Sequence, residues 1–339
     1  MRDHGGNMDW AMGHYGGGDW IDLSTGINRV PYPVPALPPE VWTMLPTVAA
    51  MQALRDAVAL HYGCAVPVVI TAGAQAAIQM MPALVGRVGL VRVIAPTYNE
   101  HAAVLRAAGW QVEEVAGLAD LAGADLAVVV NPNNPDGKTY DPADLLAVCD
   151  RVGRLVMDES FGDVAPQLSV LPHAGRPGLL VLRSFGKFWG LAGARLGFVF
   201  GAQEDVAAMT ALAGPWPVAG AALEIGRLAL QDLAWAEATR ARLQAEVARA
   251  DGLAPAAGWQ VVGGTALFRL YHTPDAQAAQ ERLARAQIWS RIFPWHPHWL
   301  RLGLPGDERE WVRLAAALVR GKRGQPRAPE YFCQDEAKF

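Results

Sequence analysis

Apolar residues recur along the chain in two patterns that alternate from about residue 50 to residue 215. One pattern is a short, nearly continuous apolar run, which predicts a strand buried on both faces of a sheet. The other has the 3.6-residue period of a helix. The alternation predicts an α/β fold with a mostly parallel central sheet. The expected strands are 68–71, 90–95, 111–115, 125–131, 154–159, 179–185 and 196–201, and the expected helices are 50–62, 74–85, 99–108 and 142–152.

The pattern changes after about residue 217, where longer helices are followed by strands near 259–271 and 288–304 and a helix near 307–320. This second pattern predicts a separate α+β unit. A length of 339 residues also predicts two structured units, at about 150 residues per domain. We therefore expect four segments: a Gly- and Pro-rich arm that packs on the small domain (1–45), a large domain (46–216), a small α+β domain (217–321) and a polar C-terminal tail (322–339).

Composition excludes several classes of protein. Apolar residues make up 52% and charged residues 18%, which is a globular balance, and the formal net charge of -4 gives no indication of a nucleic-acid or membrane-surface partner. No apolar run approaches the roughly 20 residues of a membrane span. The N-terminus has no apolar region of signal-peptide length, so we expect a cytoplasmic protein.

Cysteine and histidine spacing gives no indication of a metal site. Cys64, Cys149 and Cys333 lie far apart without a CxxC pair, which predicts free thiols. His296 and His298 flank a proline, which favours a loop, and no third ligand is placed by the sequence. We therefore expect no bound metal.

Unusual polar residues follow the expected strands, where ligands bind in open α/β sheets. Lys187 comes directly after the strand 179–185, in a glycine-rich stretch. A lysine in such a confined place can be desolvated enough to act as an amine nucleophile and form a Schiff base with an aldehyde. Ser184 and Arg195 flank it with a hydroxyl and a guanidinium suited to a phosphate. A lone loop lysine would more simply be a surface residue, so the neighbouring loops decide its interpretation.

Those loops carry what a phosphorylated aromatic aldehyde needs. Backbone N–H groups at Ala74 and Gln75 open a helix after a strand and can hold a phosphate. Tyr98 offers a ring for stacking, and a rigid turn at 131–137 contains Asn134. The carboxylate of Asp158 near the end of an apolar strand requires a cation, and a protonated pyridine nitrogen is one. Because no GxGxxG motif is present here, a nicotinamide-binding function is not supported.

The ordered set Gly73–Gln75, Tyr98, Asn134, Asp158, Ser184, Lys187 and Arg195 resembles fold type I pyridoxal-phosphate enzymes of the aminotransferase class I/II group, over nearly the whole chain. The resemblance implies that residues 46–216 bind pyridoxal 5'-phosphate and that the protein is a homodimer. It also implies roles for single residues. Lys187 would hold the cofactor as a Schiff base and move protons at the substrate Cα, and Asp158 would keep the pyridine nitrogen protonated. Asn134 would donate to the phenolic oxygen, Tyr98 would stack on the ring, and Ala74, Gln75, Ser184 and Arg195 would hold the phosphate.

Departures from the group's usual pattern point to one branch of it. Phe161 stands where a tyrosine usually bonds the phenolic oxygen, and Leu45 stands before Pro46 where a tyrosine commonly reaches the partner subunit's cofactor. The segments His4–Asn7, Ser24–Asn28 and Pro215–Val218, together with Phe161, are similar to L-threonine-O-3-phosphate decarboxylases of cobalamin biosynthesis. The resemblance implies decarboxylation of a small phosphorylated amino acid to 1-amino-2-propanol O-phosphate.

The same resemblance implies which residues hold the substrate. Arg301 would bind the carboxylate or another substrate anion, and Arg291 would lie near the substrate phosphate, because a guanidinium matches either group with two hydrogen bonds. Asn134 would also contact the substrate. His4, Gly5, Gly6 and Gly26 would complete the substrate site from the arm.

Other functions remain open at this point. An aminotransferase on a phosphorylated substrate, resembling histidinol-phosphate aminotransferase, shares the two arginines. The Cα bond perpendicular to the cofactor ring is the one that breaks, and no motif reports that orientation. A regulator that binds the cofactor without turnover would not need both Lys187 and Asp158.

Overall fold

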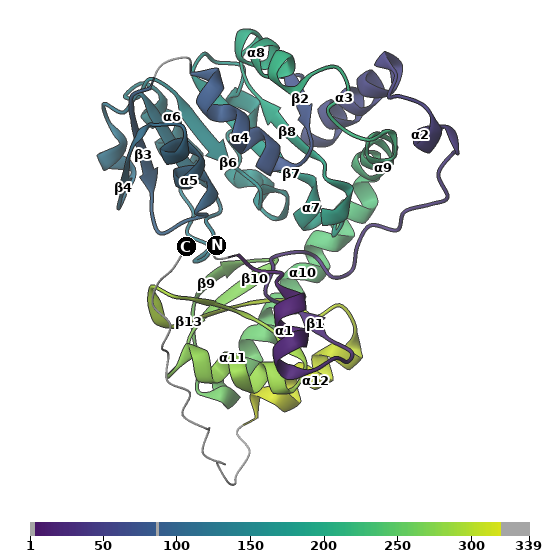
Figure 1. Ribbon diagram of the computed structural model, residues 1–339, viewed down its shortest axis with the longest axis vertical. Helices are drawn as coiled ribbons and strands as arrows, with labels where there is room; N and C mark the ends of the chain where they lie inside the picture. The colour runs from purple at the N-terminus through teal and green to yellow at the C-terminus, as the bar shows by residue number, and fades with distance from the viewer. Residues whose placement is uncertain (1–3, 86–87, 320–339) are drawn as a thin grey trace, which may run out of the picture.

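The computed structural model describes residues 4–85 and 88–319, which form two main sheets placed one above the other in Figure 1. The upper sheet has seven strands in the order β2-β8-β7-β6-β5-β3-β4. Strand β8 runs antiparallel to β7 and β2, and the pairs from β7 across to β4 are parallel. The strands are β2 (Val68–Thr71), β3 (Leu90–Ile94), β4 (Gln111–Val115), β5 (Leu126–Val130), β6 (Leu155–Asp158), β7 (Leu179–Ser184) and β8 (Gly197–Phe200). The predicted α/β class with a mostly parallel sheet is confirmed.

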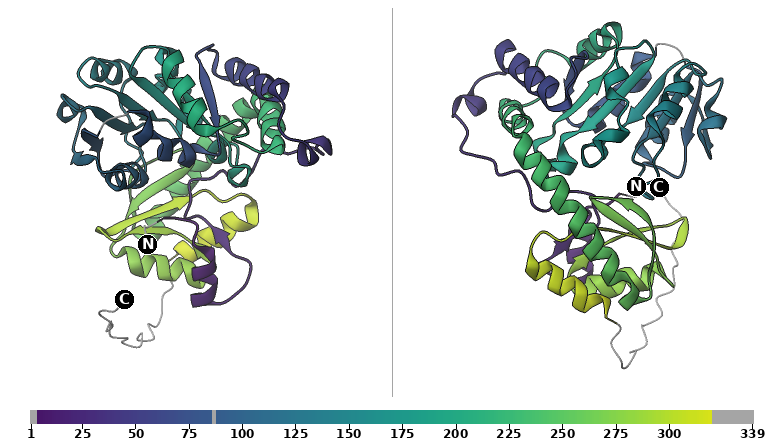
Figure 2. Two further views of the ribbon diagram at one scale, coloured as in Figure 1. Left: turned by 45° about the horizontal axis from the view of Figure 1, so that its top comes forward. Right: turned by 180° about the vertical axis from the view of Figure 1, so that it is seen from behind.

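Helices cover both faces of this sheet, as Figures 1 and 2 show. The four predicted helices are present, within three residues at each end. Asp141 caps the helix that Pro142 opens, by accepting a hydrogen bond from the backbone N–H of Ala143. The helices of this part are α2 (Glu40–Thr43), α3 (Val48–Tyr62), α4 (Ala74–Leu84), α5 (Glu100–Ala107), α6 (Pro142–Cys149), α7 (Phe185–Phe188), α8 (Gln203–Ala213) and α9 (Gly220–Gln231).

Burial follows the position of each strand in the sheet. Every residue of β5 and β6 is buried, as the continuous apolar runs predict. Strand β4 lies at the edge and exposes part of its length, where Glu113 pairs with Arg92 and Glu114 with Arg106. Charged side chains on an edge strand oppose pairing with another chain.

The lower sheet has the order β12-β13-β10-β9 and antiparallel pairing. The long helix α10 runs from the upper sheet down to this one, as the rear view in Figure 2 shows. The elements are α10 (Leu233–Leu253), β9 (Gln260–Thr265), β10 (Phe268–His272), α11 (Ala276–Arg285), β11 (Ile288–Trp289), β12 (Arg291–Phe293), β13 (His296–Gly303) and α12 (Glu308–Leu318). Short 3-10 helices are η1 (Leu118–Leu121), η2 (Gly162–Val164), η3 (Pro166–Leu168), η4 (Leu171–His173), η5 (Ala192–Ala194) and η6 (Ala254–Ala257).

The arm lies against the lower sheet before it rises to α2 (Figure 1). Helix α1 (Met8–Tyr15) contacts α11, and β1 (Ile21–Asp22) pairs in parallel with β11. The next residues place Ser24 beside β13, where Gly303 N–H donates to the carbonyl of Leu23 at 2.7 Å. At the other end of this segment the Asn28 N–H donates to the carbonyl of Lys187 at 3.0 Å, so residues 22–28 connect the lower sheet to the upper one.

One sequence expectation is wrong. His296 and His298 do not lie in a loop but in β13. Pro297 is tolerated because it precedes the part of β13 that pairs with β10, which begins at Trp299, so its missing N–H removes no bond of that ladder.

Cys64 and Cys149 are free thiols, as expected, whereas Cys333 and the tail 322–339 lie outside the described residues. Within residues 4–85 and 88–319, no helix has the length and apolar character of a membrane span. The same residues contain no group of three or more His, Cys, Asp or Glu side chains placed to hold a metal ion.

Candidate cofactor and substrate site

A cavity of about 160 Å³ opens where β2, β5, β6 and β7 end. Because parallel strands end at the same edge, residues distant in sequence meet there. The eight side chains or backbone positions that the sequence assigned to a cofactor all line it: Ala74, Gln75, Tyr98, Asn134, Asp158, Ser184, Lys187 and Arg195. Ile78, Val130, Ser160 and Phe161 complete the lining.

Lys187 lies in the short helix α7, directly after β7, and its side chain is buried in this cavity. Burial and, after it, the positive charge of Arg301 lower the pKa of its ammonium from 10.5 to about 8, against the opposing effect of Asp158. A substantial fraction of neutral amine is therefore present near neutral pH, which is the form that attacks an aldehyde.

Asp158 ends β6 and is 2% exposed. Burial alone would raise its pKa, but hydrogen bonds from His101 and from the Ser160 backbone N–H outweigh burial and lower it. The His101 Nε2 lies 2.7 Å from the Asp158 carboxylate. Asp158 is therefore held as a carboxylate, the form that pairs with a protonated nitrogen.

Sequence reasoning missed His101. It lies in the first turn of α5, three residues after Tyr98, and the two rings meet edge to face with 6.2 Å between centroids. The signal available in the sequence was the buried carboxylate itself, since an aspartate at the end of an apolar strand needs a donor as well as a cation.

The loop between β2 and α4 is shaped for an anion. Gly73 precedes the helix in a left-handed conformation (φ +80°), and no side chain caps the free N–H groups of α4. A Cβ on Gly73 would lie 2.6 Å from Nη2 of Arg195, so only glycine lets the guanidinium approach the helix start. Ser184 lines the same cavity.

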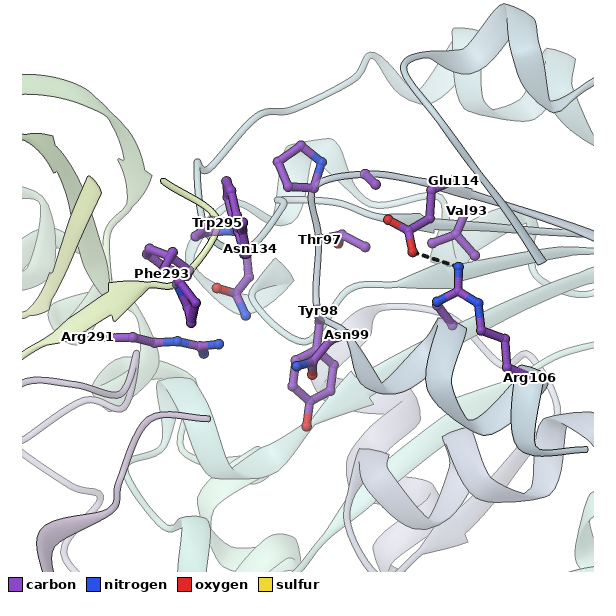
Figure 3. Close-up of a pocket in the computed structure, with 15 residues that line it drawn as sticks. Val93, Thr97, Tyr98, Asn99, Arg106, Glu114, Asn134, Arg291, Phe293 and Trp295 are labelled. Atoms are coloured by element: carbon purple, nitrogen blue, oxygen red, sulfur yellow. Dashed lines mark hydrogen bonds and ion pairs between the residues drawn. The ribbon is translucent and has the colours of Figure 1, made fainter. Parts of the chain in front are cut away.

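A second cavity, of about 560 Å³, opens beside Tyr98 and Asn134 and separates them from β12 and the turn before β13 (Figure 3). Arg291 extends into it from β12, while Phe293 and Trp295 form its far wall. Arg291 is also part of a smaller cavity of about 210 Å³ that His4 and Gly5 line from the arm. The arm and the lower sheet therefore supply polar groups to the mouth of the site.

Arg301 is 3% exposed and joins the two sheets. Its guanidinium donates to the Asn134 side-chain oxygen, and its Nη2 donates to the carbonyl of Ser24 at 2.7 Å. In the antiparallel pair β12–β13, Arg291 lies directly opposite Arg301. Two guanidinium groups thus come from neighbouring strands of one sheet, and the positive charges of both lower the pKa of Lys187.

The remaining predicted residues support the mouth of the site rather than lining the main cavity. The Gly6 N–H donates to Ser24 Oγ at 2.7 Å. Gly26 lies so close to two aromatic rings that a Cβ would be 2.8 Å from Phe161 and 2.9 Å from Phe268. Phe161 and Phe268 meet edge to face, at 5.0 Å between centroids.

A family model described as aminotransferase class I and II matches residues 19–318. The chain belongs to this family. Among curated relatives, the chain is 44% identical to the threonine-phosphate decarboxylase of Pseudomonas aeruginosa, over 94% of this chain and 98% of that protein, and 44% identical to that of a Sinorhizobium species, over 94% and 97%. A solved structure of histidinol-phosphate aminotransferase from Sinorhizobium meliloti, in complex with pyridoxal 5'-phosphate, has a TM-score of 0.81 at 20% identity and covers 91% of this chain and 92% of that one, which shows the shared fold.

The cavity of this aminotransferase-family chain fits pyridoxal 5'-phosphate by its own chemistry. A buried amine of lowered pKa suits the aldehyde, a buried carboxylate suits the pyridine nitrogen, and an uncapped helix start beside a guanidinium suits the phosphate. These three features lie around one cavity, so a single ligand can engage all of them.

Proposed function

We propose that this chain is a pyridoxal-phosphate-dependent carboxy-lyase that converts L-threonine O-3-phosphate to 1-amino-2-propanol O-phosphate in cobalamin biosynthesis. The observation that carries the proposal is 44% identity over 94% of the chain to two threonine-phosphate decarboxylases. The site supports it, because Lys187 and Asp158 suit the cofactor and the charges of Arg301 and Arg291, which suit a substrate with two anionic groups, act on Lys187.

Each predicted cofactor residue has a proposed contact. Lys187 holds the aldehyde carbon, Asp158 the pyridine nitrogen and Asn134 the phenolic oxygen, and Tyr98 covers the ring. Ala74, Gln75, Ser184 and Arg195 hold the phosphate. When bound, the cofactor accepts the electron pair that is left at the substrate Cα as a bond to that carbon breaks.

Lys187 has a second role in the proposal. When the carboxylate leaves the substrate as carbon dioxide, the Cα retains the bonding electrons and needs a proton. The Nζ of Lys187 delivers that proton, since it lies in the cavity and its pKa of about 8 lets it exchange protons near neutral pH.

Substrate anions are held from the side of the lower sheet. Arg301 and Arg291 bind the carboxylate and the phosphate, and His4, Gly5 and Gly6 cover the phosphate from the arm. Gly26 and Asn134 complete the pocket wall. By holding the carboxylate, the two arginines would orient the substrate so that the bond from Cα to the carboxylate breaks rather than the bond from Cα to hydrogen, which would select decarboxylation over proton removal.

An aminotransferase on a phosphorylated substrate is the alternative, because the paired arginines of β12 and β13 suit either reaction. The two functions differ in their need for an amino acceptor. We expect the protein to consume L-threonine O-3-phosphate at the same rate with and without 2-oxoglutarate and to leave L-histidinol phosphate unchanged. Strict dependence on 2-oxoglutarate would reverse the assignment.

We further propose that the protein is a homodimer, with the surface around α2 and the start of α3 at the interface. Large apolar side chains gather there in the open: Trp42, Met44, Leu45 and Val48 are between 58% and 86% exposed. Met44 and Leu45 also line a groove of about 190 Å³. Contiguous exposed apolar surface of this kind is typical of association sites.

A cytoplasmic location is proposed on the chemistry of the thiols. Cys64 and Cys149 are both unpaired, which suits a reducing compartment.

A further inference from the structure

Glu100, which no motif singled out, joins the arm to the cofactor loop. It is the first residue of α5 and is 5% exposed, although a carboxylate is costly to bury unless it is hydrogen-bonded. Its Oε1 lies 3.0 Å from Nε2 of His4. Its Oε2 accepts a hydrogen bond from Nε2 of Gln75 at 2.7 Å.

The contacts of Glu100 continue to the aromatic ring that faces the cofactor cavity. The hydroxyl of Tyr98 donates to Oε1 of Gln75 at 3.2 Å, and the rings of His4 and Tyr98 lie 6.0 Å apart, centroid to centroid. A chain of side-chain contacts therefore runs from Tyr98 through Gln75 and Glu100 to His4. A hydrogen-bond network of this kind stabilises a structure more when every member has its partner than when one partner is missing.

The other end of the same arm segment is fixed to the lower part of the molecule. Gly6 donates to Ser24 Oγ, and Gly5 lies so close to Ser24 that a Cβ would be 2.4 Å from its carbonyl oxygen. Ser24 in turn accepts from Arg301 through that carbonyl. Residues 4–6 thus span from Ser24, beside the small sheet, to Glu100 on the large sheet's helix.

We propose that Glu100 is a positioning residue that latches residues 4–6 across the mouth of the site. It orients His4 by engaging Nε2, which leaves Nδ1 as the ring nitrogen available to a ligand, and it holds the Gln75 side chain against Tyr98. The inference rests on the proposed function only for the identity of the ligand, the phosphate of L-threonine O-3-phosphate. The latch itself consists of contacts within this chain.

The direct test compares E100A with E114A in the full-length, cofactor-loaded protein. Glu114 is the control, since it lies at the second cavity near Tyr98 but pairs with Arg106 rather than with His4. Hydrogen exchange followed by mass spectrometry should show faster exchange in the peptide covering residues 4–15 of E100A and parental exchange in E114A. Parental exchange in E100A would overturn the latch.

Steady-state kinetics give the second readout. Losing a hydrogen bond to a charged group corresponds to roughly ten- to a hundredfold in affinity, so we expect KM for L-threonine O-3-phosphate to rise by that factor in E100A while kcat changes less than about threefold. H4A should raise KM similarly, and the double variant H4A/E100A should be no worse than either single one, because the two residues act as a unit. Additive losses, or a fall in kcat at constant KM, would contradict the positioning role. A parent protein that releases no carbon dioxide would defeat the proposed function, and the exchange experiment would still decide the latch.

Discussion

His101 and Asp158 form a buried pair, with 2.7 Å between Nε2 and the carboxylate oxygen and almost no exposure of either side chain. The pair connects the helix after β3 to the end of β6, two elements that are not consecutive in the chain. The pair explains how a buried aspartate at the end of an apolar strand keeps its negative charge.

Replacing His101 with Ala removes the donor and lets burial raise the pKa of Asp158. Asp158 is then protonated at higher pH, so the acidic limb of the kcat profile should move upward in pH. We also expect kcat at neutral pH to fall roughly ten- to a hundredfold, the cost of one unmade hydrogen bond to a buried charge. The measurement is kcat between pH 5 and pH 9. H61N is the control, because His61 is also largely buried but contacts the carbonyl of Leu230. If the acidic limb of the kcat profile is unchanged in H101A, His101 does not lower the pKa of Asp158.

The lowered pKa of Lys187 predicts how the apoprotein recaptures its cofactor. Only the neutral amine attacks an aldehyde, and it becomes the major form above pH of about 8 instead of about 10.5. The rate of cofactor uptake, followed by absorbance, should therefore rise to about pH 8 and then level off.

K187A should bind no cofactor covalently and lose activity by at least about a hundredfold. K138A, with its lysine near the surface over Tyr140, should behave as the parent. A rate that keeps rising to pH 10 would show that Lys187 is not desolvated.

Arg301→Lys tests the contacts of Arg301 with Asn134 and Ser24, which connect the two sheets. A lysine cannot contact both the Asn134 side chain and the Ser24 carbonyl with the planar geometry of a guanidinium. KM for the phosphorylated substrate should rise roughly ten- to a hundredfold, in keeping with one or two lost charge-assisted bonds. R269K is matched, since Arg269 lies on the adjoining strand β10 and pairs with Asp251. Equal KM values for R301K and the parent would remove Arg301 from the substrate site.

Gly26→Ala tests how tightly the arm is packed over the site. The added Cβ would overlap Phe161 and Phe268, and overpacking of this kind costs about 1–3 kcal/mol of folding free energy. We expect a lower midpoint of chemical denaturation and a raised KM. Gly252→Ala is the contrast, because its Cβ meets no atom within 4 Å and lies in α10, where alanine is favoured by up to about 1 kcal/mol. A G26A protein as stable as the parent would mean that the arm can shift away from Phe161 and Phe268 without cost, so that the packing over the site is not tight.

Charge on the exposed apolar surface tests the proposed homodimer. Trp42 is 67% and Leu45 63% exposed, so W42E and L45E together should cost the single chain little stability while opposing burial at an interface. Sedimentation should give a dimer for the parent and a monomer for the double variant. V312E, at a residue 60% exposed on α12, should leave the association state unchanged. A monomeric parent would end the proposal.

Much of the fold could be predicted from the sequence, because each buried strand has its own apolar pattern. Strands β5, β6 and β7 are buried along all or nearly all of their length, and their residues are apolar up to the polar residues at the ends of β6 and β7. The cofactor residues were accessible for a related reason, since they follow those strands and meet at one edge.

What sequence reasoning missed depends on pairing across long separations. Glu100 meets His4 and His101 meets Asp158, but a glutamate and a histidine at a helix start are ordinary in themselves. The bridge from Arg301 to Asn134 and Ser24 depends on the register of β13 and the path of the arm, neither of which has a periodic signature. The loop expected at Pro297 was wrong for a similar reason. A proline fits in β13 only because the pairing with β10 begins after it, at Trp299, and the sequence does not show where that pairing begins.

We propose that this protein decarboxylates its substrate at a pyridoxal-phosphate site built around Lys187 and Asp158. The most direct test mixes the cofactor-loaded protein with L-threonine O-3-phosphate and no oxo acid, and follows carbon dioxide release and the cofactor's visible absorption together. We predict many equivalents of carbon dioxide per site, with the absorption of the lysine-bound cofactor restored when the substrate is exhausted. One equivalent of aminated cofactor and no carbon dioxide would contradict the account and identify an aminotransferase instead.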